Sequence, residues 1–254
     1  MLNELLNQII GDIEAIDPAE AVGPYADQLQ IMKPQLVEQL AGELGTERAR
    51  WAAEQLSFAH LSLIKNIPDQ VQVLLRAAED PVMERQFRAA ILGTLAYLAR
   101  DRDLIPDDLP GGFGLIDDCM LLHVTTCECL EYLPRGTSTR LEERLKAAFL
   151  NLAVPTGRMP QFLDEVENVR RMIFHLGLLA PEKLDGLIEA MNADPLGAGP
   201  AALAAVDESR EPPEGPDYFD TPSSIEVSDE GAVRLVFGEA TLTMRAGEVV
   251  IEPR

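Results

Sequence analysis

The sequence predicts a mainly α-helical protein in three parts: a multi-helix domain over residues 1–193, a flexible Pro- and acid-rich linker over 194–222, and a small antiparallel β meander over 223–254. Three observations support this fold class. Apolar residues recur every three or four positions in the first part, as on one face of a helix. Proline, glycine and acids replace that pattern in the linker. Beyond it, apolar and polar residues alternate, as in half-buried strands.

Residues that begin or break helices divide the first part. Asp17-Pro18 combines a capping carboxylate with a proline in the first helical position, and Pro24 and Pro34 predict two short or kinked helices over 18–43. Asp80-Pro81 is expected to open another helix, and Thr139 and Glu142 form a capping box. The other expected helices cover about 2–16, 47–65, 67–75, 115–132, 139–153, 160–178 and 181–192.

The predicted meander has four short strands separated by turns that contain glycine. An isolated meander of this length is marginal in water, so its apolar face needs a partner surface. That surface is a second copy, another protein, or the chain's own helices. The candidate interaction residues are Val233, Leu235, Phe237, Leu242, Met244, Val249 and Ile251.

The charge of the chain excludes some partners. With 43 acidic and 21 basic residues the formal net charge is -22, which repels nucleic acid and anionic lipid, although a solvated acidic surface explains it without any partner. The apolar run over residues 89–99 is shorter than the roughly 18 residues of a membrane helix, so we expect no membrane association. Glu4 stands where a secretory signal carries basic residues, which favours a cytoplasmic location with reduced cysteines.

A segment near the middle of the chain carries a recognisable order of residues. The run over residues 96–107, which ends Asp103-Leu104-Ile105-Pro106-Asp107, is followed by Pro110, Gly114 and Asp117-Asp118. This order resembles the YkvA-type domain of unknown function over about residues 87–122, with a spacer one residue longer at Gly111-Gly112-Phe113. The resemblance implies a helical hairpin at about 87–132 and no particular activity.

The same segment holds the candidate metal ligands. We expect no cofactor, and the alternative is a divalent metal, which oxygen ligands of Asp103, Asp107, Asp117 and Asp118, with His123 nearby, would suit. The alternative is structural, because aspartates also cap turns and helix starts. Cys119, His123 and Cys127 share one helical face, which suits zinc or, more simply, a buried core.

No phosphate loop, dinucleotide motif, hydrolase elbow or zincin motif occurs, so an enzyme is less expected than a binding protein. We expect a non-catalytic adaptor or assembly protein that uses its β unit for self-association, as a homo-oligomer, or for binding a protein partner. The alternative is a metal-binding protein or metal-dependent enzyme that uses the 103–118 loop with His123.

Overall fold

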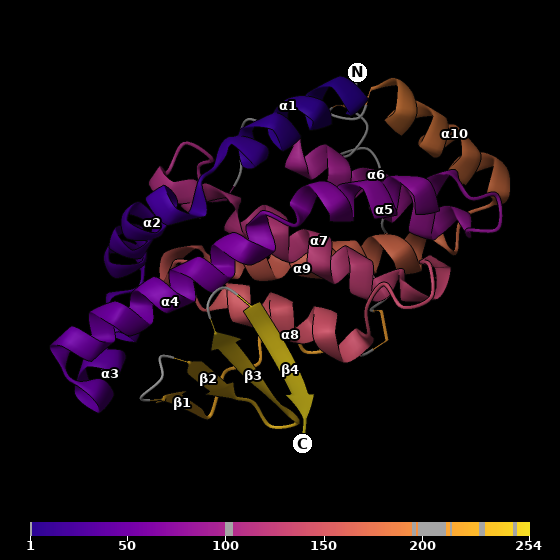
Figure 1. The fold of residues 1–254 in the computed structure, drawn as a ribbon. Coiled ribbons are helices and arrows are strands. Elements are labelled where there is room, and N and C mark those ends of the chain that lie inside the picture. The colour runs from indigo at the N-terminus through magenta and orange to yellow at the C-terminus, as the bar shows by residue number, and fades with distance from the viewer. Residues whose placement is uncertain are drawn as a thin grey trace.

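The computed structural model describes residues 2–99, 104–194, 197, 212–213, 215–228, 232–245 and 248–254 (Figure 1). A helical body precedes a small antiparallel sheet, which confirms the predicted fold class. Short 3-10 helices η1 (Pro110–Leu115), η2 (Leu130–Tyr132) and η3 (Thr156–Arg158) join some of the α-helices. The α-helices are α1 (Leu2–Ala15), α2 (Pro18–Met32), α3 (Pro34–Leu44), α4 (Thr46–Ile64), α5 (Ile67–Glu79), α6 (Arg85–Leu98), α7 (Ile116–Glu128), α8 (Arg140–Asn151), α9 (Met159–Leu176) and α10 (Pro181–Ala193).

Side-chain caps begin two of the helices where the sequence predicts them. The Asp17 carboxylate accepts a hydrogen bond from the Ala19 N–H at 2.9 Å at the start of α2. Thr139 and Glu142 form the predicted capping box of α8, with N–H to side-chain oxygen distances of 3.2 and 2.7 Å. Each cap satisfies an N–H group that has no partner inside its helix.

The helix that the sequence places at Asp80-Pro81 begins later, so this boundary is wrong. The Asp80 carboxylate accepts a hydrogen bond from the Val82 N–H at 2.9 Å and closes a turn, and α6 begins only at Arg85. An aspartate that binds the backbone two residues ahead stabilises a turn as readily as a helix start. The Asp80-Pro81 pair therefore does not distinguish a turn from a helix start.

Two glycines allow η1 to pack closely against its neighbours. Gly111 has a φ of 71°, and a Cβ there would lie 2.6 Å from the Ala21 carbonyl oxygen in α2. A Cβ on Gly114 would lie 2.3 Å from the Pro106 carbonyl oxygen. Neither position can accept a side chain without moving backbone. These glycines therefore determine how the loop between α6 and α7 sits on α2.

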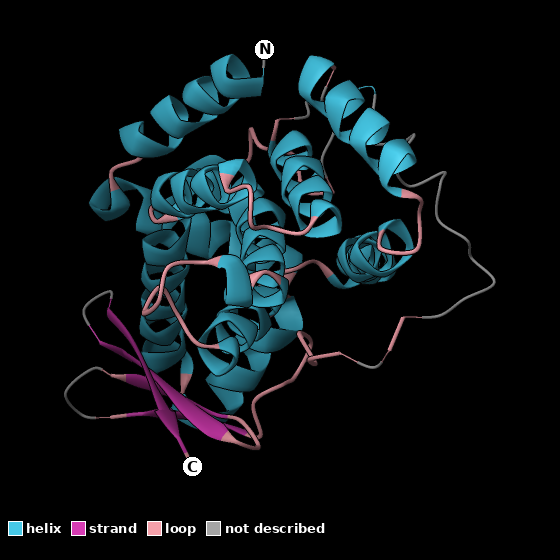
Figure 2. Ribbon diagram, turned by 90° about the vertical axis from the view of Figure 1, so that its right-hand side faces the viewer, coloured by secondary structure: helices cyan, strands magenta, loops and turns pink. Residues whose placement is uncertain are grey.

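The sheet is the predicted four-stranded meander, in the order β1-β2-β3-β4. It lies beneath α4 and α8 at one end of the helical body (Figures 1 and 2), and β2, β3 and β4 contact α4. All of its neighbouring strands are antiparallel. The strands are β1 (Ser224–Val227), β2 (Val233–Val236), β3 (Ala240–Arg245) and β4 (Glu248–Pro253).

The apolar face of the sheet is covered by the chain's own helices, as in the intramolecular alternative. The fully buried members of the candidate interaction set are Val233, Leu235, Phe237, Leu242 and Met244. Val249 and Ile251 of β4 are partly buried and pack against the same core. This face stabilises the protein itself, so an external partner has to bind the sheet elsewhere.

Part of the predicted linker lies against the helical body. Residues 195–196, 198–211 and 214 fall outside the described residues, whereas Tyr218 is buried. Its hydroxyl donates a hydrogen bond to the Glu128 carboxylate at 2.6 Å, and the Phe219 ring meets the Phe162 ring edge-on at 6.3 Å. These contacts connect the helices to the strand that follows.

Candidate functional site

The acidic residues near the start of α7 lie in different surroundings. Asp103 falls outside the described residues, Asp107 is exposed, and Asp117 and Asp118 are buried in the first turn of α7. Within the described part of the chain, no group of three or more His, Cys, Asp or Glu side chains is arranged to hold a metal ion. A metal role for the 103–118 loop stays a prediction.

Asp117 ties the loop after α6 to the start of α7. Its Oδ2 accepts hydrogen bonds from the Tyr97 hydroxyl at 3.1 Å and from the Ile105 N–H at 3.2 Å. Burial raises the pKa of the Asp117 carboxyl to about 7, against the opposing effect of these hydrogen bonds. These contacts are those of a structural residue that fixes the connection between two packed helices.

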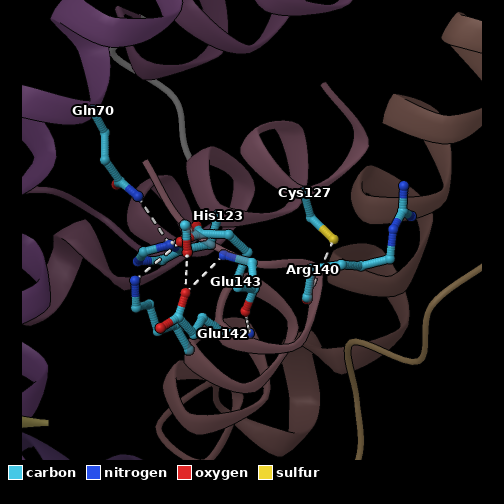
Figure 3. Close-up of polar contacts among 9 residues, drawn as sticks. Gln70, His123, Cys127, Arg140, Glu142 and Glu143 are labelled. Atoms are coloured by element: carbon cyan, nitrogen blue, oxygen red, sulfur yellow. Dashed lines mark hydrogen bonds and ion pairs between the residues drawn. The ribbon is translucent and has the colours of Figure 1, made fainter. Parts of the chain in front are cut away.

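His123 takes its polar partners from α5 and α8, away from the acidic loop (Figure 3). Its Nδ1 lies 2.6 Å from Glu143 Oε2 and 2.9 Å from the Gln70 side-chain amide. The other Glu143 oxygen accepts a hydrogen bond from Lys146 Nζ at 3.0 Å. The imidazole and the carboxylate are each 2% exposed, so this pair is almost entirely removed from water.

The environment keeps Glu143 ionised. Burial would raise the pKa of its carboxyl, but the hydrogen bond and charge of His123, together with Lys146, outweigh burial and lower the pKa to about 2. The short contact with an ionised carboxylate requires a proton on His123 Nδ1. The carboxylate therefore fixes the orientation of the imidazole, an arrangement found both in structural cores and in sites of proton transfer.

The three cysteines are buried free thiols. Burial raises the pKa of Cys119, Cys127 and Cys129, which keeps each as an unreactive thiol. Cys127 Sγ lies 3.7 Å from the Arg140 carbonyl oxygen. The interpretation of these cysteines as buried core residues is supported by this burial.

A cavity of about 500 Å³ lies where the helices meet β4. Its walls come from α4, α5, α7, α8 and the first half of β4, including Gln70, His123, Glu143 and Lys146. The sequence does not predict Gln70, Glu143 or Lys146 as site residues. Gln70 is 53 positions from His123 in the chain. Glu143 and Lys146 have the spacing of an ordinary ion pair on a helix surface. No local signal marks them.

The hydrogen-bond pattern determines which backbone N–H and C=O groups of β4 point away from β3. The Phe237 N–H donates to the Ala240 oxygen and the Arg254 N–H to the Glu239 oxygen, both at 2.9 Å. Since bonded and non-bonded pairs alternate along an antiparallel ladder, the backbone groups of Glu248, Val250 and Glu252 face β3. Those of Val249 and Ile251 face outward.

The outward edge of β4 has no neighbouring strand among the described residues. Within the same residues, no hydrogen bond involves the N–H or C=O groups of Val249 and Ile251 on that side. The Val250 side chain is 49% exposed on the outer face, between the exposed side chains of Glu248 and Glu252. We call the residues Glu248–Pro253 with this free side the β4 edge.

Known proteins give no guide to this arrangement. No family model, no curated protein and no solved structure matches the chain. The resemblance of residues 87–122 to the YkvA-type domain therefore stays a prediction. Among the described residues, no helix combines the length and apolar character that a membrane span needs.

Proposed function

We propose that this chain is a non-catalytic adaptor or assembly protein that adds an extended segment of a partner protein to its sheet at the β4 edge. The observation that carries the proposal is the outward direction of the Val249 and Ile251 backbone groups. Strand addition uses such groups for affinity and the side chains beside them for specificity.

The position of the sheet supports this function. An isolated meander would lose order too easily to serve as a template, but this one packs on α4. It contributes buried side chains to the core, each at most 1% exposed to solvent, among them Val233, Leu235, Phe237, Ala240, Leu242 and Met244. The edge is therefore held in its strand conformation before a partner arrives. A preorganised edge reduces the entropy cost of binding.

Charge favours a basic segment as the occupant. Glu248 and Glu252 flank the exposed Val250, and the whole chain has a formal net charge of -22. Opposite charges across neighbouring strands stabilise their pairing, and the field of the molecule speeds the approach of a cation. A segment with Lys or Arg opposite the two glutamates and an apolar residue opposite Val250 meets these requirements.

A second copy of the chain fits the edge less well. Two β4 edges that pair antiparallel about Val250 place Glu248 opposite Glu252 of the other copy, twice in each dimer. Like charges directly opposite one another destabilise a strand pair. Pro253 also lacks an N–H, which limits how far pairing can extend. A homo-oligomer is therefore an alternative outcome of the test.

The test uses a synthetic peptide with the core Lys-Val-Val-Val-Lys, which pairs antiparallel with residues 252 to 248. N-methylation of its second residue, opposite Ile251, removes an N–H that must bind β4, whereas N-methylation of the third residue, opposite Val250, removes one that points away. We expect the first change to abolish binding in fluorescence anisotropy and the second to preserve it.

Equal binding of both methylated peptides would show that the peptide attaches by charge alone, and the proposal would fall. Light scattering of the unliganded protein tests the alternative. A stable dimer that the Ile251→Pro variant loses would assign the edge to self-association.

A further inference from the structure

The cavity beside β4 adjoins only one end of the β4 edge. Residues 248–250 of β4 line it, whereas residues 251–253 do not. Its volume of about 500 Å³ lies within the range of roughly 300–1,000 Å³ that is typical of small ligand sites. A strand added to β4 would therefore lie beside an unfilled space at one end and not along its whole length.

The cavity combines apolar walls with an open rim. Asn66 and Thr137 line it and are exposed, so the cavity opens to solvent. Leu63 is buried, and Val73 and Val249 are partly buried against the core. Apolar surface of this kind contributes to affinity when a partner removes it from water.

The partner residue opposite Val249 points towards this cavity. Val249 packs against the helical core, and directly opposite residues of paired strands share a face. That position is the fourth residue of the Lys-Val-Val-Val-Lys core. The second residue, opposite Ile251, faces the same side, but Ile251 does not line the cavity.

A large aromatic side chain suits this space better than a small aliphatic one. Valine would leave most of the cavity unfilled, and unfilled space forfeits dispersion contacts. A Tyr or Trp ring fills more of it at the cost of few side-chain torsions, and its polar atom can remain at the wet rim. The Lys146 ammonium in the wall also favours an aromatic ring over an aliphatic chain.

Resting on the proposed strand addition, we infer that the docked segment places a Tyr or Trp side chain, opposite Val249, into the cavity beside β4. Aromatic side chains seated in pockets supply much of the binding energy of protein interfaces. The partner is then an extended basic segment with one aromatic anchor, next to the Lys that pairs with Glu248.

The experiment compares the two positions of the peptide that face the helices. We expect Tyr or Trp at the fourth residue to bind about ten-fold more tightly than Val in fluorescence anisotropy, because this position alone lies beside the cavity. The same substitution at the second residue should leave the affinity near that of the Val peptide. An equal gain at both positions would indicate general hydrophobic attraction and overturn the inference.

The Asn66→Trp variant tests the location of the anchor. Asn66 is exposed, and its side chain makes no capping hydrogen bond to α5, so the variant should fold. The new ring occupies the cavity from its rim, which should remove the preference for an aromatic fourth residue and keep the affinity for the Val peptide. Asn66→Ser, which leaves the cavity open, should keep the preference. A preference that persists in Asn66→Trp would overturn the inference.

The outcomes separate the two proposals. Equal affinity of the Val and aromatic peptides would overturn this inference and leave strand addition intact. If no peptide binds, both proposals fall together.

Discussion

The backbone N–H of Arg254 donates a hydrogen bond to the carbonyl oxygen of Glu239 at 2.9 Å. Together with the β3–β4 register, this contact directs the backbone groups of Val249 and Ile251 away from the sheet. The edge therefore stays open although the apolar face of the sheet is buried. One side of the β unit thus contributes to stability, and the proposed strand addition uses another.

Charge reversal on the β4 edge should weaken binding of the basic peptide. We expect Glu248→Lys and Glu252→Lys each to reduce its affinity several-fold, because each change replaces an attractive cross-strand pair by a repulsive one worth about 1 kcal/mol. Glu226→Lys is the matched control, since Glu226 is an exposed glutamate on β1 at the opposite side of the sheet. Equal losses for all three variants in anisotropy titrations would indicate attraction by overall charge instead of pairing at β4.

Removal of the Glu143 charge should destabilise the helical body. Glu143→Gln leaves His123 and Lys146 without their shared anion, which we expect to cost about 3 kcal/mol in the free energy of unfolding at pH 7. The measurement is urea unfolding followed by helical circular dichroism. A loss below about 0.5 kcal/mol would mean that the pair contributes little beyond an exposed ion pair.

The Glu143 carboxylate should also make the free energy of unfolding depend on pH. The pKa of Glu143 is about 2 in the folded protein, below its unfolded value of about 4.3. Its stabilisation is therefore present above about pH 4.3 and is lost as the pH falls towards 2. Subtracting the Glu143→Gln curve from the wild-type curve should reveal a contribution that declines in this window. A flat difference would contradict the assigned role of the carboxylate.

Asp117 should have the opposite dependence. Burial raises its pKa to about 7, so folding favours the protonated acid, and the protein loses stability as the pH rises from about 4 through 7. Asn at this position keeps an oxygen that can accept from Tyr97 and Ile105. We expect Asp117→Asn to flatten the loss between about pH 4 and 7 in thermal unfolding, and an unchanged slope would refute this explanation.

Gly111 and Gly11 provide a matched pair for backbone effects. Ala at Gly111 has to adopt a positive φ and meets the α2 backbone, so we expect a loss of about 2 kcal/mol or more. Gly11 lies inside α1 with nothing within 4 Å of an added Cβ, and Gly11→Ala should stabilise by about 0.5–1 kcal/mol. Chemical unfolding of both variants checks the signs, and a neutral Gly111→Ala would show that η1 can move away from α2.

The sequence predicts the parts of this protein that depend on neighbouring residues. The Asp17 and Thr139 caps, the break at Pro34 and the alternation over β2 and β3 act within a few positions of the chain, and each is confirmed. The start of α6 is missed because Asp80 caps a turn with the same geometry that would cap a helix.

The site is less predictable because it depends on tertiary packing. His123 is singled out by the sequence for its spacing from the cysteines, yet its partners Gln70 and Glu143 come from two other helices. The alternation of Leu242 and Met244 shows that the sheet needs a cover but not that α4 supplies it. The cavity beside Val249 exists only once the helices and β4 are assembled.

The most direct test of strand addition is amide hydrogen exchange of the protein with and without the basic peptide, resolved by residue through NMR. We expect the Val249 and Ile251 amides to gain protection on binding, while the Val250 and Glu252 amides, already bonded to β3, change little. Protection confined to other residues, or none at Val249 and Ile251 at saturating peptide, would contradict it.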